Sequence, residues 1–89
     1  MKPIIEQPDH CDFGGFDPKR PWMNEWAKWR GVNKDGTEWE SNKQLYLHDN
    51  QDYFWLRERE YSYFLKYQII NDNIDMAGKD WTRSKQERK

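Results

Sequence analysis

The spacing of three tryptophans predicts a helix near the start of the chain. They recur at i, i+4 and i+7, which places them on one helical face: Trp22, Trp26 and Trp29. Asp17 and Pro18 suit an N-cap and a first helical residue, while Arg30 and Gly31 suit a basic last turn and a terminal glycine. We therefore expect a helix over residues 18–30.

The longest stretch rich in apolar side chains spans residues 50–71. The alternating charges from Arg57 to Glu60 favour a helix, and at 100° per residue the apolar side chains fall on two faces. Such a helix needs cover on both sides. A strand over 61–69 is the alternative, because apolar residues recur there with period two and aromatic residues favour strands. We predict the helix and keep the strand open.

Shorter elements follow from turn and capping signals. Residues 1–21 hold all four prolines, which predicts an irregular arm over 1–17. Asn33 to Gly36 predicts a turn or a small hairpin, in which Gly36 supplies a positive φ. A short strand over 44–48 is expected after it.

The end of the chain reads as a loop followed by a basic tail. Residues 72–80 form the loop, and Asp80 suits the cap of a short helix over 81–88. Together these elements predict a single, mainly α domain over residues 1–89, with two or three helices, an irregular arm and a short hairpin. The alternative is an α+β domain with an aromatic-rich antiparallel sheet.

Composition shifts attention to surfaces. Fifteen of the 89 residues are aromatic, six of them Trp, whereas only ten are Ile, Leu or Val. The mean hydropathy is -1.37, so the rest of the chain is very polar. Because Trp and Tyr are enriched where one surface meets another, part of the aromatic set is expected to be a docking surface.

Charge is nearly balanced overall and uneven in detail. The net charge of -1 provides no long-range attraction to nucleic acid or membrane. Residues 79–89 carry five basic and two acidic residues, a sum of +3, and the remaining 78 residues sum to -4. An aromatic ring in this basic tail could stack on single-stranded nucleic acid, through the set Trp81, Arg83 and Lys85.

Candidate chemistry is sparse. The potential metal ligands are Cys11, His10 and His48 with neighbouring aspartates, and they lack the tight repeated spacing of zinc sites. A thiol nucleophile needs a nearby base, and nothing in the spacing of Cys11 and His48 supports such a pair. No phosphate-binding or hydrolase motif occurs. We therefore expect no metal, no cofactor and no enzymatic activity. The single cysteine, the absence of an apolar leader and the lack of a membrane-length apolar run favour a cytoplasmic setting.

These observations favour a non-enzymatic interaction protein that docks on a larger protein partner and acts sterically. That character is typical of small phage proteins that inhibit a host machine. The residues expected to make the contact are Trp22, Trp26, Trp29, Trp39 and Trp55, with Arg57 and Arg59 at the rim. The alternatives are a single-stranded nucleic-acid-binding accessory protein and a structural subunit of a larger assembly. A homodimer is a further option, because the predicted helix 50–71 needs a second cover.

Overall fold

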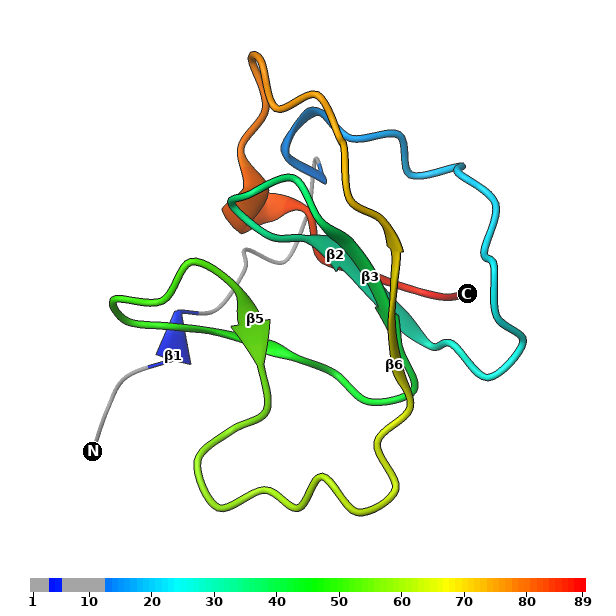
Figure 1. The fold of residues 1–89 in the computed structure, drawn as a ribbon, viewed down its shortest axis with the longest axis vertical. Coiled ribbons are helices and arrows are strands. Elements are labelled where there is room, and N and C mark those ends of the chain that lie inside the picture. The colour runs from blue at the N-terminus through cyan, green and yellow to red at the C-terminus, as the bar shows by residue number, and fades with distance from the viewer. Residues whose placement is uncertain (1–3, 6–12) are drawn as a thin grey trace.

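Antiparallel strands build this protein. The structure is a computed structural model, and it describes residues 4–5 and 13–89 (Figure 1). The strands are β1 (Ile4–Ile5), β2 (Trp29–Val32), β3 (Glu38–Ser41), β4 (Tyr46–His48), β5 (Phe54–Trp55), β6 (Tyr67–Asn71) and β7 (Gln86–Glu87). Two single 3-10 turns complete the set, η1 (Phe13–Gly15) and η2 (Trp81–Arg83).

The strands form two sheets. One has four strands in the order β6-β3-β2-β7, and the other has three in the order β1-β4-β5, with every neighbouring pair antiparallel. The chain leaves β5, runs through a long loop and returns along β6 (Figure 1). The described residues therefore form a mainly β domain.

The mainly α prediction is wrong, and so is the α+β alternative, because residues 4–5 and 13–89 contain no α-helix. Residues 18–30 do not form a helix. The side chain of Asp17 accepts a hydrogen bond from the Lys19 N–H at 2.8 Å, but only a turn follows it. Trp29 already belongs to β2, so the three tryptophans share no helical face.

The predicted helix over 50–71 is also absent. The segment is divided into β5, a loop with two turns, and β6. Asn50 and Arg59 have positive φ values of 63° and 69°, which an α-helix does not tolerate. The strand alternative over 61–69 overlaps β6 only from residue 67 onward.

The short elements were predicted more accurately. The turn at Asn33–Gly36 is confirmed, since it joins β2 to β3 and Gly36 has a φ of 86°. Strand β4 confirms the short strand expected within 44–48. Asp80 does cap a turn, accepting from the Thr82 N–H at 3.1 Å, but the element is the single turn η2 rather than a helix over 81–88. Most of the predicted arm, residues 1–3 and 6–12, lies outside the described residues.

The hydrophobic core lies where the two sheets meet. Its buried members are Trp39, Leu45, Leu47, Phe54 and Leu56. The indole of Trp39 is fully buried, and its centroid lies 5.4 Å from the Phe54 ring. Gly31, opposite Trp39 on β2, provides the room, because a Cβ there would lie 2.6 Å from Trp39 Cζ2. The glycine that suggested a helix end therefore serves to seat an indole.

The opposite face of the four-stranded sheet is polar and yet buried. Alternation along the strands places Arg30, Glu38, Glu40 and Gln86 on this face. It is covered by residues 16–28, which we call the strap. Arg30 donates to the carbonyls of Pro18 and Arg20, and Glu40 accepts from the N–H groups of Met23 and Asn24. Bonds from sheet side chains to the strap backbone thus replace the helix that local signals predicted.

Candidate partner-binding surface

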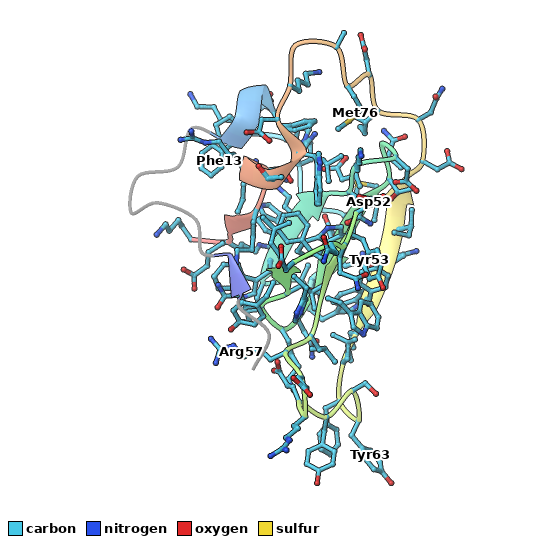
Figure 2. The ribbon with its side chains drawn as sticks, turned by 90° about the vertical axis from the view of Figure 1, so that its left-hand side faces the viewer. Phe13, Asp52, Tyr53, Arg57, Tyr63 and Met76 are labelled. Carbon is cyan, nitrogen blue, oxygen red and sulfur yellow. The ribbon has the colours of Figure 1, made fainter. Side chains whose placement is uncertain are left out.

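The most exposed aromatic side chains gather in the loop between β5 and β6. We call residues 57–66 the aromatic loop. Tyr61, Tyr63 and Phe64 are 79, 85 and 81% exposed, whereas Trp39 in the core is fully buried. Figure 2 shows Tyr63 at the tip of the protein, beyond the end of the sheet. Three large apolar groups are therefore presented together to the surroundings.

Two consecutive turns shape the aromatic loop. The Glu60 N–H donates to the Arg57 carbonyl at 3.0 Å, and the Leu65 N–H donates to the Ser62 carbonyl at 3.0 Å. Glu60 also accepts from the Arg57 N–H through its side chain at 3.1 Å. Leu65 turns inward and packs against the hydrophobic core. The turns explain how aromatic residues so close in sequence point outward while their neighbour is held inside.

Asn42, just after β3, ties this loop to the sheet. Its Nδ2 donates to the Phe64 carbonyl at 2.8 Å, and its Oδ1 accepts from the Lys66 N–H at 2.8 Å. Its own N–H donates to the Lys66 carbonyl at 3.0 Å. Lys43 adds a hydrogen bond to the Tyr61 carbonyl at 3.2 Å. These hydrogen bonds tie the backbone of the aromatic loop to the residues that follow β3.

A second apolar group adjoins the loop at both of its ends. Trp55 of β5 is 39% exposed, and its ring meets the Tyr67 ring edge-on at 5.3 Å. Ile69 of β6 is 40% exposed. The strands that enter and leave the aromatic loop thus continue its apolar surface onto the sheet.

Charges of both signs border the rings. The aromatic loop contains three basic residues and two acidic residues: Arg57, Arg59 and Lys66, and Glu58 and Glu60. The Arg57 guanidinium lies 4.3 Å from the centroid of the Tyr46 ring, and Lys43 lies 3.6 Å from Glu60. A mixed charged rim around apolar anchors is the usual anatomy of a protein interface.

The residues predicted to make the contact fall in different environments. Trp39 is fully buried, and Trp29 packs against the core. Trp22 is half-buried beneath two guanidiniums, with Arg30 at 4.4 Å and Arg88 at 5.2 Å from its ring centroid. Trp26 is half-buried in the strap. The structure does not bring the tryptophan stripe together as a surface.

Three of the predicted contact residues lie at the aromatic loop or directly before it: Trp55, Arg57 and Arg59. All three are exposed. The sequence interpretation did not include Tyr61, Tyr63 and Phe64 among the contact residues. It placed Tyr61 and Phe64 on two faces of the predicted helix, and Tyr63 only in the strand alternative. The signal that could have found them is the break in apolar pattern after the charged run, where Ser62 separates two tyrosines.

The residues of the nucleic-acid alternative are mostly engaged within the fold. Trp81 packs against the core, with its ring edge-on to Phe54 at 5.7 Å. Lys85 is buried and donates to the Leu45 carbonyl at 3.2 Å. Arg83 is half-buried. These side chains do not form an exposed basic stacking platform.

Two of the shifted pKa values belong to charged groups on the buried polar face. Burial raises the pKa of Glu38, against the opposing effect of Arg20, whose Nη2 lies 2.8 Å from Glu38 Oε2. Burial likewise lowers the pKa of Arg30. Glu38 pairs with Arg20 of the strap, and Arg30 donates to strap carbonyls. The two pKa shifts therefore reflect the packing of charges inside the fold.

No metal-type cluster of three His, Cys, Asp or Glu side chains occurs in residues 4–5 and 13–89. His10 and Cys11, two of the candidate ligands, lie outside the described residues. Within the same ranges, no helix has the length and apolar character needed to cross a membrane. Compared with protein-family models, curated proteins and solved structures, the chain matches none.

Proposed function

We propose that this protein is a non-enzymatic interaction protein that docks the aromatic loop onto a larger protein partner. The carrying observation is that three aromatic rings close together in sequence are each about 80% exposed, on a loop whose backbone is bonded to Asn42 and Lys43. Exposed rings contribute nothing to the core. Their apolar surface is removed from water only when a partner binds over it.

The order of the loop supports binding by a rigid surface. Tyrosine and phenylalanine have few rotatable bonds, so they bury a large area at a small cost in entropy. The centroids of the Tyr63 and Phe64 rings lie 5.7 Å apart, and the interplanar angle is 39°. A surface ordered before binding loses less freedom on association.

The action proposed is steric. A docked loop of this size covers a site on the partner or bridges two surfaces. An inhibitor of phage type and a permanent subunit of an assembly would both use such a contact, and they differ in how long it lasts.

The test compares two variants in capture from a lysate of the native host. The loop variant replaces Tyr63 and Phe64 with Ser. The control replaces Met23, which is 68% exposed but lies in the strap, with Ser. We expect a protein that is retained by the wild type and by the Met23 control but not by the loop variant. Titration of the identified protein should then show a loss of about 2 kcal/mol or more for the loop variant.

The proposal fails if the loop variant, folded by circular dichroism, retains the same partner with unchanged affinity. It also fails if the Met23 control loses the partner as completely as the loop variant does, because the effect would then be general loss of apolar surface.

A further inference from the structure

We infer that the free edge of β6 accepts an extended segment of the partner protein, which adds as a fifth strand beside the aromatic loop. This inference rests on the proposed function, because the same partner makes both contacts. It adds the mode of recognition, which is backbone pairing at a sheet edge next to aromatic anchors.

Strand β6 is the last strand of its sheet. Its partner on one side is β3, and within the described residues no strand pairs with its other side. Figure 2 shows β6 at the outer margin of the sheet, with no ribbon beyond it. An edge of this kind presents unpaired N–H and C=O groups.

The register shows which groups point outward. The Asn42 N–H donates to the Lys66 carbonyl, and Gln68 is the partner of Glu40. Because inward and outward residues alternate in an antiparallel pair, the backbone groups of Tyr67 and Ile69 point away from β3. Ile69 pairs with Trp39 of β3, and Asn71 pairs with Glu38, so the register shifts after Ile69. The regular part of this edge is therefore short. It fits a segment of about four residues.

The side chains along this edge do not protect it. Natural edge strands are usually guarded by Lys, Pro or other charged residues. The five residues of β6 include no charge and no proline. Ile69, the partner of Trp39 in the register, is partly exposed, and so is Trp55, whose ring contacts Tyr67 of the same strand. The added segment would therefore place an apolar side chain against them.

A separate partner fits this edge better than a second copy of the chain. Antiparallel pairing of two copies of β6 would bring the aromatic loop of each copy toward residues 71–73 of the other. Those residues are Asn71, Asp72 and Asn73, all polar and exposed. They would leave the three rings without apolar cover. A partner that contributes its own strand can cover the rings as well.

The test uses a phage-displayed library of random 12-residue peptides as the probe, selected on the immobilised wild-type protein. Peptides recovered there are synthesised and titrated against two variants. Ile69→Pro removes the outward N–H, a change that edge strands tolerate. Ile69→Thr keeps the N–H and the β-branched shape, and it is the matched control. We expect affinity to fall at least about tenfold in Ile69→Pro, because a peptide carbonyl loses its donor. Ile69→Thr should bind much more like the wild type.

Amide hydrogen exchange provides the second measurement. Bound peptide should slow exchange at Tyr67 and Ile69, and N-methylation of alternate peptide residues should abolish the effect. This measurement is made on the wild-type protein, so it remains decisive even if Ile69→Pro does not fold.

Several outcomes would overturn the inference. One is that no peptide is enriched on the wild type. Another is that enriched peptides leave the exchange of Tyr67 and Ile69 unchanged. A third is that sedimentation shows a dimer of the wild-type protein that Ile69→Pro abolishes. If binding is lost in the Tyr63/Phe64 variant but kept in Ile69→Pro, the docking function stands and strand addition is rejected. If Ile69→Pro loses binding while the loop variant keeps it, the edge is the site and the aromatic loop is not.

Discussion

Pairs of contacting aromatic rings occur in this protein both in the buried core and in the exposed aromatic loop. Trp39 and Phe54 meet between the sheets with ring centroids 5.4 Å apart, while Tyr63 and Phe64 meet in the loop at 5.7 Å. The distances are nearly equal, but one pair is fully enclosed and the other is more than 80% exposed. A contact between two rings therefore does not by itself show that the pair stabilises the fold. Whether the rest of the protein buries the pair is what decides its contribution to stability.

The difference has a structural origin. Trp39 lies in the middle of β3, between two strands, and Gly31 leaves space for its indole. The aromatic loop has no sheet around it, and Asn42 holds only its backbone. The three rings of the aromatic loop are exposed, and their backbone is held in place. They are therefore accessible to a partner.

The largest effect is expected for Trp39→Ala. Removal of a fully buried indole should lower the free energy of unfolding by about 3–5 kcal/mol, because transfer and cavity terms add. Urea denaturation followed by circular dichroism measures this. A loss below about 1 kcal/mol would show that the cluster is not the core and would remove the contrast with the loop.

Gly31→Ala tests the same cluster from the neighbouring strand. The new Cβ would lie 2.6 Å from Trp39 Cζ2 and 3.0 Å from Cε2, and a buried indole has little room to move. We expect a loss of about 1–3 kcal/mol, as for other overpacked cores. The double variant with Trp39→Phe should lose less than the sum of the two single changes. Strict additivity would contradict the contact.

Much of this arrangement could not be predicted from the sequence. The turn at Asn33–Gly36 was predictable, because its residues carry the bond-forming side chains and the glycine that the turn needs. The strap was not, because its helix signals are local while the bonds that hold it come from Arg30 and Glu40 on the sheet.

The aromatic loop was hidden for a related reason. Helical periodicity places Phe64 on one face and Tyr61 on another, and it does not reveal whether any surface exists to cover them. The hydrogen bonds from Asn42 that hold the loop join residues more than 20 positions apart, so local sequence patterns do not reveal them. Trp55, Arg57 and Arg59 were placed in the candidate surface from their residue types, and that assignment stays a prediction.

Asn42→Ala should loosen the loop at a moderate cost. It removes the donor to the Phe64 carbonyl and the acceptor for the Lys66 N–H, both at exposed positions where water can substitute. We expect the free energy of unfolding to fall by about 1 kcal/mol. Amide exchange at Lys66 should speed up in Asn42→Ala. In Asn42→Asp it should not, because the acceptor remains. Equal exchange in both variants would mean that Asn42 does not order the loop.

Phe64→Ala should change the free energy of unfolding by no more than about 0.5 kcal/mol, since exposed side chains contribute little to stability. Thermal and urea melts of this variant, set beside Trp39→Ala, measure the contrast directly. A loss comparable to that of Trp39→Ala would place Phe64 in the core and leave the docking surface without its anchor.

The smallest effect concerns Tyr67, whose ring contacts both the buried Trp39 and the partly exposed Trp55. Burial raises the pKa of the Tyr67 hydroxyl above its ordinary value of 10.0, although a hydrogen bond with Asn33 opposes the shift. The folded state therefore holds this proton more tightly than the unfolded state. Its contribution to stability is fully present below pH 10 and is lost as the pH rises through the folded pKa. Urea melts between pH 8 and 11 should show a decline in the wild type that is shallower in Tyr67→Phe. Parallel declines in the two proteins would mean that the Tyr67 hydroxyl is as solvated in the folded chain as in the unfolded one, and that the core ends before this ring.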